Sequence, residues 1–154
     1  MDPKPFPIEK FPTLSGLCKE IFKNFSKKSL LLNSLDRAPS PRQVEAQYRN
    51  EFYRVFKSLL GNGVGISTEW ARGKGGRVDF RIMGPNWGVE FLIDGTFKTL
   101  NDHYDRFRPG GQYHGWILEG LMSDWVVIDC RCSDPPGTSK FTSLLHLWVT
   151  PNCN

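Results

Sequence analysis

The chain is poor in cysteine, and the few cysteines it has form no recognisable framework. Four occur among 154 residues. Cys18 and Cys153 stand alone near the two ends, and Cys130 and Cys132 are separated by one residue with no second pair to match them. This spacing fits neither a structural zinc site nor a set of disulfides. We therefore expect reduced thiols, as in a nuclear or cytoplasmic compartment.

Long apolar stretches are lacking too. No run is long enough to span a membrane, so no membrane partner is expected. The segment Met1–Pro5 lacks the apolar centre of a secretory signal, which also favours a nuclear or cytoplasmic location. The sequence contains no Gly-x-x-x-x-Gly-Lys-Ser/Thr spacing, so we expect no nucleotide-binding loop in these residues.

What is present is typical of a globular domain. Hydrophobic residues make up 39% and aromatic residues 13% of the chain, which is enough for a sizeable core. The net charge of +4 is compatible with a polyanionic partner but does not single one out. No internal repeat or low-complexity tract is found.

Hydrophobic periodicity predicts a mixture of helices and strands. Helices are expected at Leu14–Phe25, Pro41–Leu60 and Thr96–Phe107, with shorter helical turns at Leu30–Leu35 and Gln112–Leu121. Strands are expected at Val64–Arg72, in the two halves of Gly76–Gly95, at Asp124–Arg131, and at the sheet edge over Phe141–Thr150. A proline-rich break near residue 39 divides a helical accessory segment, residues 1–38, from the main domain, residues 39–154.

The stretch GRVDFRIMGPNWGVEFLIDG, from Gly76 to Gly95, is central to the interpretation. Apolar and polar residues alternate on both sides of the turn Met83–Asn86, which predicts two neighbouring strands. Asp79 lies in the middle of the first strand and Glu90 in the middle of the second. Acids are disfavoured in strand centres, and their convergence on one sheet face is most simply explained by a divalent cation. Hard oxygen ligands suit Mg²⁺ or Mn²⁺, so Asp79 and Glu90 are the candidate metal ligands.

Other acids could join this pair. Glu69 lies near the end of the preceding strand. On the helix Pro41–Leu60, Glu45 projects near the middle of the apolar stripe and Glu51 lies at its edge. Both helix acids are either ordinary solvated carboxylates, or one of them points at the acidic site; the sequence leaves these alternatives open.

The order helix, three-stranded meander, helix, strand is that of the restriction-endonuclease-like core, an α/β fold with a mixed sheet. The chain resembles members of this PD-(D/E)xK superfamily through Asp79 and Glu90. More specifically, it resembles the nuclease domain of Crinkler-type proteins of fungi and oomycetes. The runs that carry the resemblance are EAQYRNEFYR, GRVDFRI, WGVEFLIDG, HYDRF and DWVVIDCR, spread over about Pro39 to Val149.

The resemblance implies a metal-dependent nuclease in which the acids ligate Mg²⁺ and a lysine two residues after the glutamate assists the attacking water. Here that position holds Leu92. Three substitutes for the lysine are conceivable: Arg81, Lys98, or Arg106 together with His103 on the helix that follows. We rank Arg106 with His103 first, because they are three residues apart and share a helix face. Asp94 is either a further ligand or the start of an Asp-Gly turn.

Two functions therefore compete at this stage. The first is a nuclease acting on DNA, or on RNA, with Asp79, Glu90, Glu69, Glu51, His103 and Arg106 as candidate catalytic residues. The second is a degraded relative that keeps the fold to bind nucleic acid or a protein partner. Retention of the acids favours the first, since buried acids without a cation are costly. In Crinkler-type proteins an NTPase region often precedes the nuclease domain, and the sequence does not decide oligomeric state.

Overall fold

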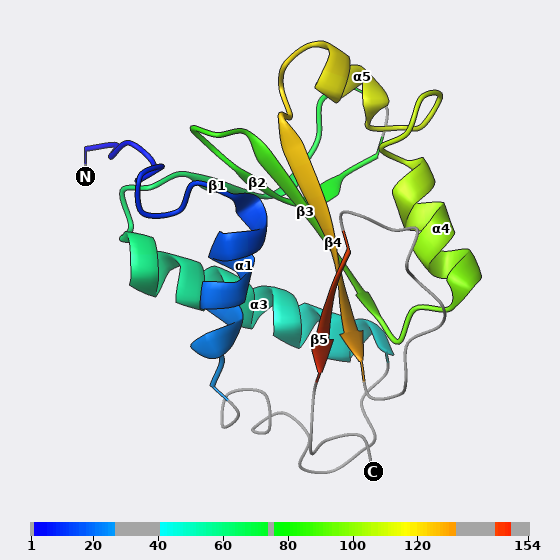
Figure 1. Cartoon of the computed structure of the whole chain (residues 1–154), viewed down its shortest axis with the longest axis horizontal. Helices are drawn as coiled ribbons and strands as arrows, with labels where there is room; N and C mark the ends of the chain where they lie inside the picture. Colours follow the sequence, from blue (N-terminus) through cyan, green and yellow to red (C-terminus); the bar gives the residue numbers. More distant parts are fainter. Residues whose placement is uncertain (1, 27–40, 74–75, 132–143, 149–154) are drawn as a thin grey trace.

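The computed structural model describes residues 2–26, 41–73, 76–131 and 144–148 (Figure 1). Its elements, in chain order, are α1 (Leu14–Lys23), α3 (Pro41–Leu60), β1 (Ile66–Trp70), β2 (Val78–Ile82), β3 (Trp87–Ile93), α4 (Phe97–Asp105), α5 (His114–Leu118), β4 (Asp124–Arg131) and β5 (Leu144–Trp148). Within these residues the fold is a mixed α/β arrangement built on one five-stranded sheet.

The sheet has the strand order β1-β2-β3-β4-β5. Strands β1, β2 and β3 form an antiparallel meander, whereas β4 runs parallel to β3, and β5 runs parallel to β4. Parallel neighbours need a crossover connection, and α4 and α5 lie in the crossover between β3 and β4. Helices α1 and α3 pack on one face of the sheet, and α4 and α5 pack on the other (Figure 1).

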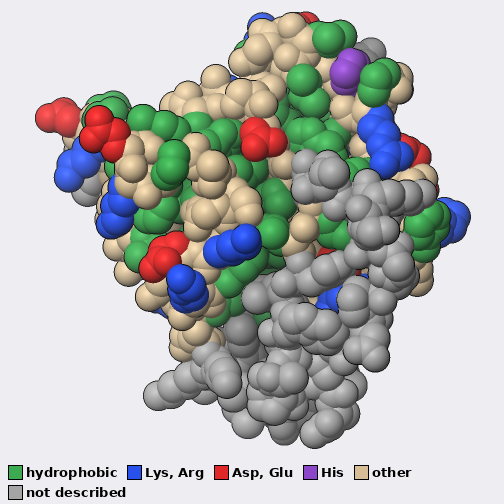
Figure 2. All heavy atoms as spheres, in the orientation of Figure 1, with side chains coloured by type: hydrophobic (Ala, Val, Ile, Leu, Met, Phe, Trp, Pro, Cys, Tyr) green, Lys and Arg blue, Asp and Glu red, His purple; other side chains and the backbone are tan. Residues whose placement is uncertain are grey.

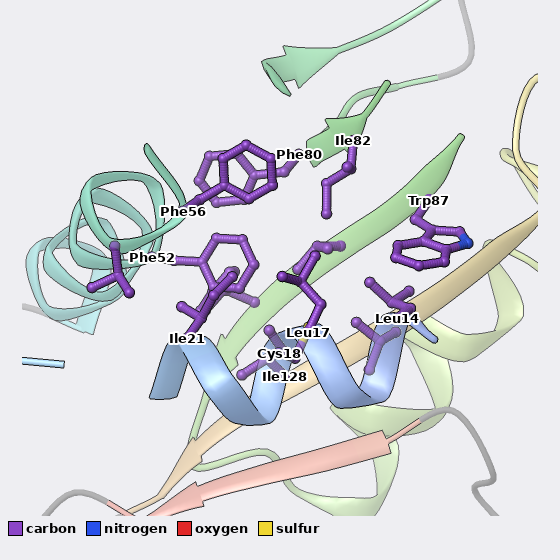
Figure 3. Close-up of a cluster of buried hydrophobic side chains, with 14 of the residues drawn as sticks. Leu14, Leu17, Cys18, Ile21, Phe52, Phe56, Phe80, Ile82, Trp87 and Ile128 are labelled. Carbon is purple, nitrogen blue, oxygen red and sulfur yellow. The ribbon is translucent and has the colours of Figure 1, made fainter. Parts of the chain in front are cut away.

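The larger hydrophobic core lies between the sheet and helices α1 and α3 (Figure 3). Helix α1 buries a single stripe made of Leu14, Leu17, Cys18 and Ile21. From α3, Phe52 stacks on Phe80 of β2 with ring centroids 5.3 Å apart. Helix α1 belongs to the segment that the sequence assigned to an accessory region, and it packs against α3 and β4 in the same core as the sheet.

A second core lies on the opposite face, under α4 and α5. It consists of Val78, Leu92, Leu100, Tyr104, Phe107, Tyr113, Trp116, Met122 and Val127. Its aromatic rings pack closely: Phe107 stacks on Trp125 at 4.2 Å, and Tyr113 stacks on Trp116 at 4.6 Å. This core holds α4 against the sheet, and the polar side of α4 carries residues of the candidate site.

Within the described residues, the predicted elements agree with the structure in type and order. Helix α3 and strand β4 have the predicted bounds, and α1 and α4 end two residues earlier than predicted. The apolar positions that alternate along β2 and β3, and two in the apolar run of β4, are buried in this one mixed sheet, namely Val78, Phe80, Val89, Phe91, Val126 and Ile128. Strand β3 is buried on both faces up to Leu92, because the crossover helices cover its second face. The alternation in its sequence does not predict this burial.

Several predictions fall outside the described residues. These are the helical turn Leu30–Leu35, the first part of the last strand, and the environments of Cys132 and Cys153. Cys18 and Cys130 are buried free thiols. None of the described helices is long and apolar enough to cross a membrane. On the described part of the face in Figure 2, basic and acidic side chains are interspersed, so the net positive charge does not gather there.

Candidate functional site

Asp79 and Glu90 lie beside each other on the face of the sheet that α4 covers. The register pairs Phe80 of β2 with Val89 of β3, and both of these side chains point into the larger core. Continuing by one residue on each strand places Asp79 next to Glu90 on the opposite face. A hydrogen bond of 2.8 Å from the amide of Phe91 to Asp79 Oδ2 fixes the aspartate against β3.

Glu90 is buried, with 2% of its side chain exposed, and three side chains bind its carboxylate. His103 Nδ1 and Arg106 Nη1 each lie 2.9 Å from Oε2. The hydroxyl of Tyr113 lies 2.9 Å from Oε1 and 2.6 Å from the carbonyl oxygen of Arg77. Because the hydroxyl has one proton, it donates to one of these acceptors at a time. Burying a carboxylate is costly unless such partners bind it, and here α4 and the loop after it supply them.

Asp79 is less completely neutralised. Arg49 of α3 reaches its Oδ1 with Nη1 at 3.2 Å, a long contact for a charge-assisted hydrogen bond. Burial and the neighbouring charge of Glu90 raise the pKa of Asp79 to about 6, and the Phe91 amide and Arg49 only partly oppose that shift. The ionised form of Asp79 is therefore disfavoured first by burial and second by the charge of Glu90.

Glu45 is a third acid close to the pair. It lies on α3 one helical turn before Arg49 and is half-buried. Burial raises its pKa, as does the charge of Glu90, while Arg49, His103 and Arg106 act in the opposite direction. Charges that influence one another in this way are close in space, so α3 and α4 bring acids and cations to the same end of the β2–β3 pair.

A buried ion pair in β4 anchors the start of α4. Asp129 Oδ2 accepts from Arg131 Nη1 at 2.7 Å, and both side chains are almost fully buried. The same two residues bind the backbone of Gly95: its amide donates to Asp129 Oδ1, and its carbonyl accepts from Arg131. Thr96 then caps the helix by accepting from the amide of Thr99. The direction of α4, and so the position of His103 and Arg106, depends on this contact.

Two acids predicted from the sequence lie away from the pair. Glu69 is exposed on β1, with Arg77 3.7 Å away as its partner. Glu51 is buried, but it accepts from Arg54 at 2.6 Å and from the amide of Ser26 at 2.7 Å. Glu51 therefore ties α3 to the segment after α1. The structure brings together Asp79, Glu90, His103 and Arg106, and it leaves these two apart.

The three candidate substitutes for the missing lysine also differ in whether they lie near the acid pair. Leu92 is buried in the second core. Arg81 donates to the carbonyl of Leu121 and to Asn86, and its guanidinium lies over the ring of Trp70. Lys98 is exposed and pairs with Asp102. Of the three alternatives considered, only Arg106 with His103 contacts an acid of the pair.

Sequence reasoning missed Arg49 and Tyr113. Arg49 lies on a helix that precedes the strands by many residues, and its only local signal is its spacing of four from Glu45, which places the two on one face of α3. Tyr113 lies in a loop and has no periodic signal at all. Asp94, the other open alternative, has a positive φ of 43° and begins the turn that ends β3.

Comparison with known protein families, with curated proteins and with solved structures gives no match.

The donor chemistry at this site suits a hard divalent cation, with two carboxylates as its protein ligands. A bound cation would offset both the burial of the ionised Asp79 and its repulsion by Glu90. Among the described residues, no group of three or more acidic, histidine or cysteine side chains is placed so that it could hold a metal ion. Mg²⁺ commonly keeps several waters and takes only one or two carboxylates from the protein. The pair Asp79 and Glu90 meets that requirement.

Proposed function

We propose that the chain is a metal-dependent phosphodiesterase that cleaves nucleic acid, with DNA as the first substrate to test and RNA as the second. The observation that carries the proposal is the pair Asp79 and Glu90 on adjacent strands, with Arg106 and His103 bound to the glutamate. Carboxylates can bind a metal ion, and a basic side chain beside them can bind the phosphoryl group on which that ion acts.

In this proposal Asp79 and Glu90 hold Mg²⁺ or Mn²⁺. The bound cation would supply Lewis-acid stabilisation of the charge that develops on the phosphoryl group. Glu90 is held in one orientation by His103 and Arg106, and the hydroxyl of Tyr113 lies within hydrogen-bond distance of its second oxygen. The side chain of Arg106 is 36% exposed, so it can reach a phosphoryl oxygen while it remains near Glu90. Arg106 would thus take over the role of the lysine that Leu92 replaces.

A plasmid-cleavage assay tests the proposal directly. Supercoiled DNA should be nicked or linearised in Mg²⁺ or Mn²⁺ and left intact in EDTA. Asp79→Asn should abolish cleavage, while the matched exposed change Asp102→Asn on α4 should leave it unchanged, because Asp102 is exposed and forms an ion pair with Lys98. Calorimetry should show Mn²⁺ binding to the unmodified protein and none to Asp79→Asn. Cleavage that persists in EDTA, or in Asp79→Asn, would refute the proposal.

One observation favours a second candidate, a binding module without catalysis. Each oxygen of Asp79 and of Glu90 already lies within hydrogen-bond distance of a donor of the protein. With Leu92 in the lysine position, the same cluster would then serve to join α3 and α4 to the sheet. Binding of labelled DNA without any metal-dependent cleavage, in the same assay, would favour this alternative.

A further inference from the structure

Arg49 has hydrogen-bonding capacity that the described residues do not use. A guanidinium carries five N–H donors in a planar fork. Arg49 makes one contact with a carboxylate, through Nη1 to Asp79 Oδ1 at 3.2 Å. Its Nε is buried and has no hydrogen-bond acceptor within the described part of the chain. Buried N–H groups are rarely left without an acceptor, because they lose their bonds to water.

Arg106 offers a useful comparison. Its Nη1 lies 2.9 Å from Glu90 Oε2, and His103 shares that oxygen. Arg106 is therefore firmly held by a buried carboxylate. Arg49 makes a longer contact, 3.2 Å from Nη1 to Asp79 Oδ1, and its Nε has no acceptor among the described residues. Of the two arginines, Arg49 therefore makes the weaker contact with its carboxylate.

The two arginines also approach the acid pair from different sides. Arg106 follows α4, on the face of the sheet that carries the second core, whereas Arg49 comes from α3, which packs in the larger core. A phosphodiester lying over Asp79 and Glu90 would have one guanidinium on each side. Guanidinium groups bind phosphate oxygens in pairs, through Nε and one Nη together, which is the pairing that Arg49 lacks at present.

We propose that Arg49 binds a non-bridging oxygen of the nucleic-acid backbone, with Nε and Nη donating together once the phosphate draws the guanidinium from Asp79. This inference rests on the proposed function for its ligand, a phosphodiester strand. It assigns to α3 a phosphate contact that neither the acid pair nor α4 provides. In the absence of substrate, Arg49 stays on Asp79 and offsets part of its charge.

The test measures binding in a background that cannot cleave. In Asp79→Asn protein, with EDTA present, a fluorescent DNA duplex is bound at several salt concentrations with and without Arg49→Gln. Loss of one phosphate contact should lower the slope of log K against log salt by about 0.9. Lys23→Gln, which removes one exposed positive charge from α1, should leave the slope unchanged. Equal slopes with and without Arg49→Gln would overturn the inference.

The Asp79→Asn protein also distinguishes a phosphate contact of Arg49 from a role in which Arg49 only neutralises Asp79. If Arg49 serves only to neutralise Asp79, then its replacement in Asp79→Asn protein should not alter the salt slope at all. A second measurement uses the unmodified side chain: the Nε–H resonance of Arg49, assigned with Arg49→Lys, should move when the duplex is added. A resonance that stays in place while other resonances of the protein move would contradict the inference.

The outcome is independent of whether the chain cleaves DNA. A reduced salt slope in Arg49→Gln, together with no metal-dependent cleavage by the unmodified protein, would support the phosphate contact and refute the nuclease proposal. Full metal-dependent cleavage with an unchanged slope would support the nuclease proposal and refute the role of Arg49.

Discussion

Arg106 donates to Glu90 Oε2 over 2.9 Å, although the two residues are 16 positions apart, one just after the end of α4 and the other in the buried strand β3. The contact exists because the chain turns sharply at Gly95 and α4 runs back over β3. The contact places the permanent positive charge of Arg106 beside the carboxylate of Glu90, which is 2% exposed. The same contact gives α4 a polar anchor in addition to its apolar one.

Arg106→Ala should lower metal-dependent cleavage on the order of 100-fold, since loss of one preorganised contact to a developing charge costs about 3 kcal/mol. Arg106→Lys keeps the charge but lacks the planar guanidinium, so its cleavage rate should lie between those of the unmodified protein and Arg106→Ala. The measurement is the cleavage rate at saturating Mn²⁺. Lys98→Ala provides the comparison, because Lys98 is exposed and forms an ion pair with the exposed Asp102. A rate for Arg106→Ala equal to that of Lys98→Ala would remove Arg106 from the site.

Asp79→Asn should raise the free energy of unfolding at pH 8 more than at pH 4. The folded state raises the pKa of Asp79 from 3.8 to about 6, so it holds the proton more tightly than the unfolded chain does. Stability from this group is therefore intact below about pH 4 and is lost as the pH rises to about 6. The full loss is on the order of 3 kcal/mol, and asparagine, which cannot ionise, avoids it.

Urea unfolding in EDTA at the two pH values gives the comparison for Asp79. Asp102→Asn is the matched change at an exposed aspartate. Equal effects of Asp79→Asn at pH 4 and pH 8 would mean that the pKa of Asp79 is not raised by folding.

Tyr113→Phe should destabilise the protein by about 1–2 kcal/mol, because Glu90 Oε1 and the carbonyl of Arg77 lose the hydroxyl between them. The packing of the ring on Trp116 is retained in phenylalanine. Tyr53→Phe is the matched control, since Tyr53 lies on the exposed side of α3. Thermal unfolding measures both variants, and an identical midpoint for the two would contradict the role assigned to Tyr113.

Gly111→Ala should destabilise the protein by more than about 2 kcal/mol. An added Cβ at Gly111 would meet the carbonyl oxygens of Asp105 and Arg106, which are backbone atoms that cannot turn aside. Gly115→Ala is the control, because nothing lies within 4 Å of its Cβ and the residue is inside α5. That variant should be neutral or gain up to about 1 kcal/mol. Urea unfolding measures both variants. An equal urea midpoint for Gly111→Ala and Gly115→Ala would show that the loop tolerates the added Cβ.

The sequence by itself determined the elements and their order. Period-2 and helical patterns are local, so α3 and β4 could be predicted to the residue. Alternation in β2 likewise predicted which of its side chains are buried. The same local reasoning put Asp79 and Glu90 on one face of neighbouring strands, because a tight turn between two strands fixes their register.

Only the tertiary structure decided which distant side chains meet this pair. Helical spacing showed that His103 and Arg106 share a face, but the turn at Gly95 and the buried pair Asp129 and Arg131 decide where that face points. Glu51 illustrates the reverse, since it lies on the same helix as Glu45 yet binds Arg54 and Ser26.

Arg49 and Tyr113 show the limit most clearly. Each reaches its carboxylate from an element whose packing is set by apolar residues elsewhere, Phe52 for α3 and Trp116 for the loop before α5. Local sequence patterns describe which way a side chain points from its own helix or strand. The distance between Arg49 and Asp79, 30 positions apart, is set instead by how two cores close on opposite faces of one sheet.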